Sequence, residues 1–239
     1  MSTEPKKIKK GVALAGVNAG TTAVCTVGHS GNDLHYRGYD ILELAKKCSF
    51  EEVAFLLIHG ELPNISQLEK YKNQLKKLRD IPTYLKTVLE QIPKDAHPMD
   101  VMRTGCSMLG ILEPEANDRN IDKTKDIADR LISCFSAILI YWYKFSHEGI
   151  RIDCNTNENS IAGHFLHLLH GKTPSSLHER SMNISLILYA EHEFNASTFA
   201  ARVITGTLSD LYSSITGAIG ALRGPKHGGA NEVAMEIIS

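Results

Sequence analysis

Apolar side chains recur at helical spacing along most of this chain. The segment 65–79, ISQLEKYKNQLKKLR, places apolar residues on one face of a helix and charged residues on the other. Residues 49–52, SFEE, have the pattern of a capping box, and the apolar stretch after them runs into Gly60, a residue type that commonly ends helices. The pattern predicts one helix that starts at 49–52 and stops at Gly60, and a second, surface helix over 65–79.

Prolines and small polar residues mark where other helices begin and end. Pro82 and Pro93 bracket a short helix, and Pro98 suits the first turn of the next one. Thr173 and Pro174 have the composition of an N-cap and a first helical residue. The apolar spacing predicts further helices at about 159–170, 174–191, 195–206 and 209–222.

The longest apolar run is LISCFSAILIYWY at 131–143, inside a helix that we predict over 121–146. This run is too short to cross a bilayer, which takes about 20 residues. A helix that is apolar on nearly every side has to be covered all round. We therefore expect it either in the centre of the domain or in an interface between subunits.

One segment, 21–40, has a convincing β pattern. A Thr/Val-rich run and a Leu-His-Tyr run flank HSGND, whose glycine, asparagine and aspartate suit a hairpin turn. The sequence contains no internal repeat and no low-complexity stretch. The predicted fold class is mainly α, a large helical domain with a small N-terminal β-hairpin.

Composition and charge exclude some partners and locations but do not indicate a specific function. The chain has 239 residues, 43% hydrophobic and 22% charged, with a formal net charge of −1. This charge gives no overall field that would attract nucleic acid or an anionic membrane, so we expect neither as a partner. The lysines at 6, 7, 9 and 10 are interpreted as a solvated tail, because Asn18 and Gly20 interrupt the apolar run that a signal peptide would need. These features predict a cytoplasmic protein.

Neither the cysteines nor the histidine-rich segment predicts a metal site. The five cysteines are odd in number and widely scattered, with no C-x-x-C pair, which also argues against a disulfide framework. His164, His167 and His170 follow one another at spacings of three, which turns the third ring about 60° from the first on a helix. No carboxylate or cysteine stands at a helpful spacing, so we interpret these histidines as structural core residues and expect no metal.

A first candidate site lies in ILYAEHEFNAST at 187–198. An apolar helix face ends there in Glu-His-Glu, and Asn195 follows before the next predicted helix. Backbone N–H groups at a helix start can receive a small polyanion, and His192 together with the Asn195 amide could orient it. The alternative at this point is an ordinary helix cap beside a surface histidine.

A second candidate site lies in RGPKHGGANE at 223–232. Gly224 and Pro225 specify a turn, and the two glycines after His227 leave no side chain between the backbone and a ligand. A helix predicted from Ala230 onward would disfavour a cationic His227, and a neutral imidazole suits donation of a hydrogen bond to a developing enolate oxygen. The alternative is a glycine-rich helix entry with an incidental histidine. Enolisation also needs a base, and no other constellation in the sequence offers one.

Several long segments resemble the citrate synthase family. RGPKHGGANE resembles its active-site histidine segment, YAEHEFNASTFAAR its oxaloacetate-binding segment, and GVNAGTTAVCTVGHSGNDLHYRGYDI and HPMDVMRTG two further family segments. ILIYWYKFSHEG at 138–149 and HFLHLLHGK at 164–172 resemble the 2-methylcitrate branch of that family. The resemblance covers nearly the whole chain.

The resemblance implies a fold and a reaction. Family members are largely α-helical homodimers whose small domain closes over the substrates bound to the large one. They are acyltransferases that condense an acyl-CoA with oxaloacetate and water. In this branch the donor is propionyl-CoA, a substrate rather than a cofactor, and the products are 2-methylcitrate and CoA, in propionate catabolism. His227 matches the catalytic histidine that stabilises the enol(ate), His192 matches the histidine that holds oxaloacetate, and Asn195 lies beside it.

The same resemblance places part of the catalytic set outside this chain. The family's second catalytic histidine and its aspartate base would both come after residue 239. We therefore expect 1–230 to be a nearly complete large domain, 231–239 to begin the small one, and the chain alone to be inactive. Two alternatives stay open. One is a citrate synthase that uses acetyl-CoA, since one methylene is worth only about 1–3 kcal/mol of discrimination. The other is a non-catalytic dimerisation module, for which the apolar run would supply an interface.

Overall fold

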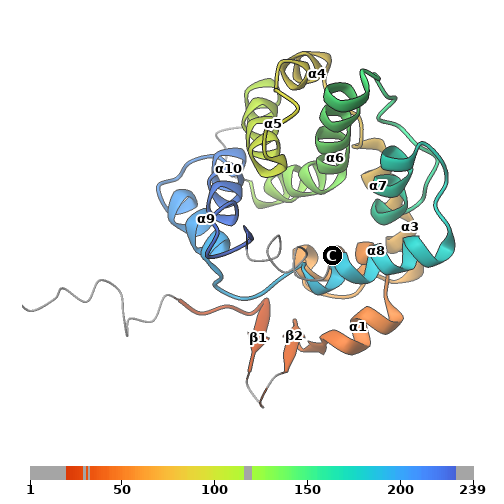
Figure 1. The fold of residues 1–239 in the computed structure, drawn as a ribbon. Helices are drawn as coiled ribbons and strands as arrows, with labels where there is room; N and C mark the ends of the chain where they lie inside the picture. Colours follow the sequence, from red (N-terminus) through yellow and green to blue (C-terminus); the bar gives the residue numbers. More distant parts are fainter. Residues whose placement is uncertain (1–19, 29–30, 32, 116–119, 230–239) are drawn as a thin grey trace, which may run out of the picture.

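Helices make up most of the described chain, as predicted (Figure 1). The computed structural model describes residues 20–28, 31, 33–115 and 120–229. The helices in this part are α1 (Ile41–Lys47), α2 (Phe50–His59), α3 (Ile65–Lys77), α4 (Thr83–Glu90), α5 (Pro98–Leu112), α6 (Ile121–Glu148), α7 (Ile161–His170), α8 (Ser176–Leu188), α9 (Ala196–Gly206) and α10 (Leu211–Leu222). The predicted boundary between a large and a small domain, at 230 and 231, lies outside the described residues.

The predicted N-terminal hairpin is confirmed and continues into a third strand. β1 (Cys25–Val27), β2 (Leu34–Tyr36) and β3 (Tyr39–Asp40) pair antiparallel in that order. The β2–β3 turn places Arg37 and Gly38 at φ 50° and 87°, the left-handed backbone that tight hairpin turns require. So short a third strand carries little sequence pattern, which is why we did not predict it.

Most of the predicted helix ends are confirmed. Ser49 and Glu52 form a reciprocal capping box at the start of α2, and Gly60 ends that helix in a left-handed conformation. Pro98 is the first residue of α5, with His97 as its N-cap. These ends depend on local backbone chemistry, and local sequence therefore predicts them.

The predicted start of α8 at Thr173 and Pro174 is wrong. The N-cap is Ser175, whose hydroxyl accepts a hydrogen bond from the His178 backbone N–H. The Thr173 hydroxyl instead donates to the Glu158 carboxylate at 2.8 Å. The Thr173 hydroxyl is therefore engaged in a tertiary contact, and Ser175, the next residue with a suitable side chain, caps the helix instead.

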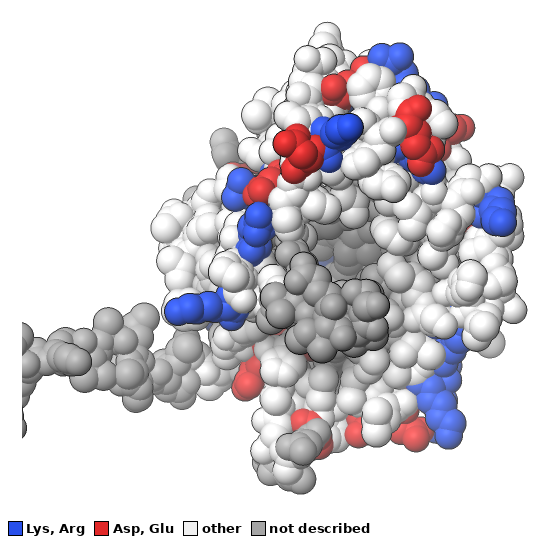
Figure 2. All heavy atoms as spheres, in the orientation of Figure 1, with Lys and Arg blue, Asp and Glu red and all other residues white. Residues whose placement is uncertain are grey.

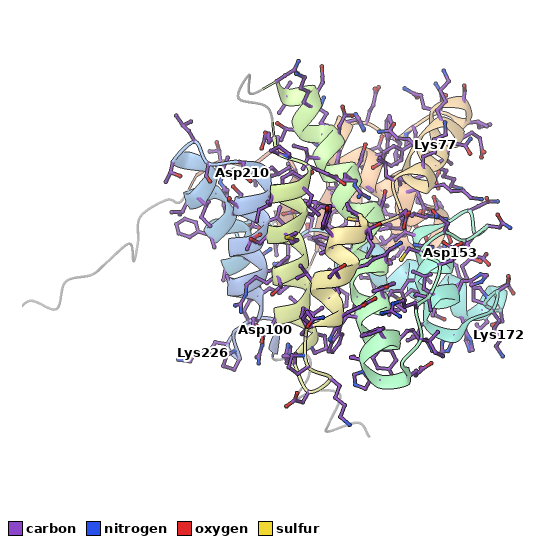
Figure 3. The ribbon with its side chains drawn as sticks, turned by 90° about the horizontal axis from the view of Figure 1, so that it is seen from above. Lys77, Asp100, Asp153, Lys172, Asp210 and Lys226 are labelled. Carbon is purple, nitrogen blue, oxygen red and sulfur yellow. The ribbon has the colours of Figure 1, made fainter. Side chains whose placement is uncertain are left out.

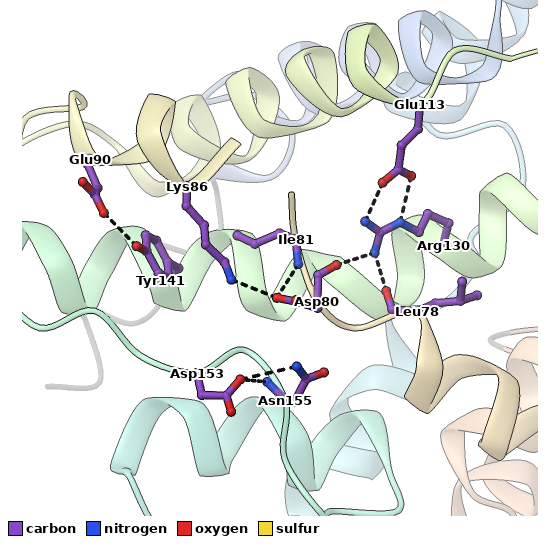
Figure 4. Close-up of polar contacts among 10 residues, drawn as sticks. All are labelled: Leu78, Asp80, Ile81, Lys86, Glu90, Glu113, Arg130, Tyr141, Asp153 and Asn155. Carbon is purple, nitrogen blue, oxygen red and sulfur yellow. Dashed lines mark hydrogen bonds and ion pairs between the residues drawn. The ribbon is translucent and has the colours of Figure 1, made fainter. Parts of the chain in front are cut away.

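The apolar helix α6 lies at the centre of the domain, which was one of its two predicted surroundings. It contacts α3, α4, α5 and α7, and its side chains from Leu131 to Trp142 are buried or half-buried. Hydrogen bonds and ion pairs also join α6 to the surrounding segments (Figure 4). The Arg130 guanidinium donates to both carboxylate oxygens of Glu113, at 2.9 and 2.7 Å, and also to the backbone carbonyls that precede α4.

The helices α9 and α10 form one side of the molecule (Figure 1). α10 packs between α5 and α9. Gly217 faces α9, and a Cβ there would lie 2.1 Å from the Ile204 Cδ1, so the Ile204 side chain would have to shift. In Figure 3, Asp210 lies at one end of α10, and Lys226, just after the helix, lies toward the other end. There the Arg223 Nε lies 3.5 Å from the Asp100 carboxylate of α5. This packing sets where the chain after α10 is placed.

Over the residues that the structure describes, neither sign of charge dominates the face in Figure 2. Lysine and arginine are interspersed with aspartate and glutamate on the face in Figure 2. Within the described ranges, none of the helices combines the length and apolar character that crossing a membrane requires.

Candidate active site

All three residues that the sequence singled out border one cavity of about 600 Å³. His192 and Asn195 come from the segment between α8 and the start of α9, and His227 comes from the turn after α10. Apolar and hydroxyl-bearing side chains complete much of the wall: Met99, Leu188, Ala190, Ser197, Thr198 and Leu222. The fold thus brings together two segments that the sequence keeps apart.

The segment between α8 and α9 is held by a helix cap at its far end. Asn195 is the N-cap of α9, and its Oδ1 accepts a hydrogen bond from the Thr198 backbone N–H at 3.0 Å. The alternative of an ordinary cap beside a surface histidine is therefore correct for this oxygen, and His192 is an exposed residue at the edge of the cavity. The Nδ2 of the same amide is a donor, and the residue faces the cavity, so capping and ligand binding are compatible.

The turn that carries His227 is closed by backbone hydrogen bonds. The N–H groups of His227 and Gly229 donate to the Gly224 carbonyl at 2.9 and 3.3 Å, and the Gly228 N–H donates to the Leu222 carbonyl at 3.0 Å. A Cβ on Gly228 would lie 2.4 Å from that Leu222 oxygen, which no side chain tolerates. The prediction of tightly specified backbone around His227 is confirmed. The helix predicted after it lies outside the described residues.

A short hydrogen-bond chain joins the two segments across the cavity. His227 Nε2 lies 3.0 Å from Ser197 Oγ, and Ser197 Oγ donates to Asn195 Oδ1 at 2.7 Å. Because Asn195 Oδ1 also accepts from the backbone, its amide orientation is settled. Both candidate sites are therefore parts of one polar network.

Ser197 controls which nitrogen of a neutral His227 carries the hydrogen. While Ser197 donates to Asn195, its oxygen can only accept from His227 Nε2–H, and Nδ1 is then an acceptor. If the hydroxyl hydrogen turns toward Nε2, the imidazole hydrogen moves to Nδ1, which can then donate to a ligand. Rotation of the Ser197 hydroxyl group thus decides whether Nδ1 of a neutral His227 accepts or donates a hydrogen bond.

Glu191 is a cavity residue that the sequence analysis did not single out. Burial raises the pKa of its carboxyl, and hydrogen bonds from the backbone of Glu193 and His192 oppose that rise. In the sequence it was one member of a Glu-His-Glu run. The role of Ser197 was also missed, because its contact with His227 spans 30 residues and leaves no local signal.

The three clustered histidines have separate surroundings. His164 is fully buried, with Nδ1 3.0 Å from Thr156 Oγ1, whereas His167 Nδ1 lies 2.7 Å from the Glu158 carboxylate. His170 is exposed at the end of α7, so the prediction of a core histidine is wrong for this residue. In the part of the chain that the structure describes, no three histidine, cysteine, aspartate or glutamate side chains group together as metal ligands would.

Known proteins resemble this chain over almost its whole length. The family described as "Citrate synthase, C-terminal domain" matches residues 13–239. A 2-methylcitrate synthase of Shewanella oneidensis is 60% identical over 99% of this chain. A 2-methylcitrate synthase of Mycobacterium tuberculosis is 43% identical over 97% of it.

A solved structure shares the fold. Citrate synthase from Thermoplasma acidophilum, in a ternary complex with carboxymethyl coenzyme A and oxaloacetate, aligns with a TM-score of 0.86 and 32% identity. That alignment covers 94% of this chain and 59% of the solved one. The chain likewise spans 62% of the Shewanella relative and 58% of the Mycobacterium relative.

Proposed function

Because the chain belongs to the citrate synthase family, we propose that it supplies the oxaloacetate-binding and enol-stabilising half of a 2-methylcitrate synthase. The whole reaction would condense propionyl-CoA with oxaloacetate and water, and would release 2-methylcitrate and CoA. The observation that carries the proposal is the meeting of His192, Asn195 and His227 at one cavity, with His227 tied to the other segment through Ser197.

The start of α9 suits a dicarboxylate such as oxaloacetate. A helix N-terminus presents partial positive charge, and the cavity wall includes Asn195, Ser197 and Thr198 from its first turn. Asn195 Nδ2 can donate to a carboxylate oxygen while Oδ1 keeps its capping role. His192 would orient the substrate from the adjoining wall.

His227 would act on the acyl donor. Removal of the α-proton of propionyl-CoA places negative charge on the thioester oxygen, and a hydrogen bond from His227 Nδ1 would stabilise it. A neutral imidazole can donate there once Ser197 donates to Nε2. The resulting enol attacks the oxaloacetate carbonyl carbon, and water then cleaves the thioester to release CoA as a thiol.

The remaining catalytic groups would come from sequence that this chain lacks. The chain spans 62% of the Shewanella relative. The family resemblance puts the aspartate base and the second histidine beyond residue 239. Loss of a general base or acid costs about 10²- to 10⁴-fold in rate. We therefore expect the 239-residue chain alone to turn over far more slowly than a complete enzyme.

We also propose that the protein is a cytoplasmic homodimer. None of the residues of α9 is buried, and Val203 and Leu208 are 54% and 65% exposed. A second copy would cover these two apolar side chains, as homodimer interfaces do. Analytical ultracentrifugation tests this assignment: we expect the parent chain to sediment as a dimer and Val203→Glu as a monomer. A dimeric variant would contradict the assignment of this surface.

The test of the proposed reaction joins this chain to the part of the Shewanella relative that it does not cover. We expect this chimera to release thiol from propionyl-CoA in the presence of oxaloacetate, faster than from acetyl-CoA, and the 239-residue chain not to do so. His227→Ala in the chimera should lower the rate by about 10²- to 10⁴-fold, and His170→Ala, at an exposed site, should leave it unchanged.

Two results would overturn the proposal. One is a folded chimera that releases no thiol from either donor. The other is a His227→Ala chimera as active as its parent. If the chimera prefers acetyl-CoA, the assignment to the citrate synthase family stands, and the product is citrate instead of 2-methylcitrate.

A further inference from the structure

The hydroxyl group of Tyr36 lies inside the backbone turn that leads to His192. Tyr36 is the last residue of β2 and is 0% exposed. Its Oη lies 3.0 Å from the Ile187 carbonyl oxygen, 3.3 Å from that of Leu188 and 3.0 Å from that of Glu191. The Glu191 backbone N–H in turn donates to Oη at 3.2 Å.

These contacts add a side-chain partner to backbone groups at and just after the end of α8, where the Ile187 carbonyl also accepts from the Ala190 N–H at 3.2 Å. The last carbonyls of a helix have no N–H ahead of them, and burying them unpaired is costly. The Tyr36 hydroxyl hydrogen is shared among the three carbonyl oxygens, and a lone pair of the same oxygen accepts the hydrogen bond from the Glu191 N–H. Glu191 is held at both its N–H and its carbonyl, which fixes the peptide group directly before His192.

His192 therefore stands between two anchors. Tyr36 holds the residue before it, and the Asn195 cap holds the chain three residues after it. Between them, Glu193 has φ 56°, a left-handed conformation that a residue with a Cβ adopts at a cost. Such a conformation persists when its surroundings hold it. The Glu191 carboxylate accepts hydrogen bonds from the backbone of His192 and Glu193, and the Tyr36 hydroxyl in turn holds Glu191.

We propose that Tyr36 is a positioning residue for oxaloacetate, acting through His192. The hydroxyl holds the 188–191 turn so that the imidazole of the next residue faces the cavity, and it couples the small β-sheet to the substrate site. The inference rests on the proposed role of His192. It predicts that removal of one oxygen atom, remote in sequence from the site, weakens oxaloacetate binding.

The test compares two tyrosine-to-phenylalanine variants of the full chain. Tyr36→Phe removes the anchoring hydroxyl and keeps the buried ring. Tyr71→Phe is the matched control, because Tyr71 is also buried and its Oη donates to Asp129 at 2.7 Å, away from the cavity lining. Circular dichroism confirms folding, calorimetry measures oxaloacetate affinity, and hydrogen exchange measures amide protection in 187–193.

In Tyr36→Phe we expect roughly tenfold weaker oxaloacetate binding and roughly tenfold faster exchange in 187–193, from the loss of a shared buried hydrogen bond. Tyr71→Phe should change neither. A double-mutant cycle with His192→Ala separates positioning from general destabilisation. If Tyr36 acts through His192, Tyr36→Phe should change the affinity by less than about twofold in the His192→Ala background.

Unchanged affinity in Tyr36→Phe would overturn the inference, and so would the same loss of affinity in the His192→Ala background or in Tyr71→Phe. If the parent chain binds no oxaloacetate, the proposed function fails, and positioning for that ligand fails with it. Hydrogen exchange then still decides whether Tyr36 holds the turn, so the two failures are distinguishable.

Discussion

Ser197 influences which nitrogen of a neutral His227 carries the hydrogen. A neutral histidine donates at one nitrogen only, and the partner of the other nitrogen decides which one. When the Ser197 hydroxyl hydrogen turns from Asn195 toward Nε2, 3.0 Å away, a neutral His227 carries its hydrogen at Nδ1 and can donate there. This matters because hydrogen bonds to a developing enolate are among the larger contributions to such catalysis.

Substitution of Ser197 tests this role at the level of one atom. In the chimera, Ser197→Ala should lower thiol release by roughly 10- to 100-fold, the effect of one hydrogen bond that strengthens in the transition state. Oxaloacetate affinity should change much less, since the Thr198 N–H still orients the Asn195 amide. Ser197→Thr keeps the hydroxyl and should restore most of the rate. Equal rates for the alanine variant and its parent would contradict the assignment.

Individual site residues differed in how far the sequence could predict them. His227 stood in a glycine-rich turn and Asn195 at a helix start, and both patterns are local. Glu191 carried no such signal, because its raised pKa comes from burial. The anchoring by Tyr36 joins residues more than 150 positions apart, a distance over which propensity and spacing carry no information.

At the scale of elements, local chemistry predicted helix starts except where a tertiary contact competed. The capping box at Ser49 and the proline at the start of α5 are confirmed. The predicted cap at Thr173 failed because Glu158, from another segment, binds its hydroxyl. The apolar run predicted that α6 would be covered all round, and its packing against four helices supplies the cover within this chain.

Helix α7 makes the stability of the protein depend on pH. Burial, followed by the charges of Arg79 and His167, lowers the pKa of His164 from its ordinary 6.5 to about 3. The unfolded chain takes up this proton near pH 6.5 and the folded chain does not. Its contribution to stability is therefore complete above pH 6.5 and is lost progressively as pH falls toward 3.

When the pH falls from 7 to 5, His164 alone should lower the free energy of unfolding by about 2 kcal/mol. Carboxylates with lowered pKa values act in the same direction, so the informative quantity is a difference between variants. By urea unfolding, His164→Gln should lose about 2 kcal/mol less than the parent over this interval, whereas His170→Gln on the same helix should follow the parent. Parallel losses in all three proteins would show that His164 does not remain neutral in the fold.

At the scale of the whole molecule, the cavity lies where three distant parts of the chain meet. The sheet holds the turn before His192, α9 supplies the cap and the serine, and α10 delivers His227. The order of helices and the class of fold were predictable from periodicity and resemblance. The hydrogen-bond network across the cavity was not, since it depends on how α9 and α10 pack together.

On the proposed function, this cavity binds oxaloacetate through His192 and Asn195. The most direct test is calorimetric titration of oxaloacetate into the chain, into His192→Ala, and into His170→Ala as an exposed-histidine control. We expect saturable binding that His192→Ala weakens by roughly tenfold or more and that His170→Ala leaves unchanged. Binding that is absent from the parent chain, or equal in parent and His192→Ala, would contradict it.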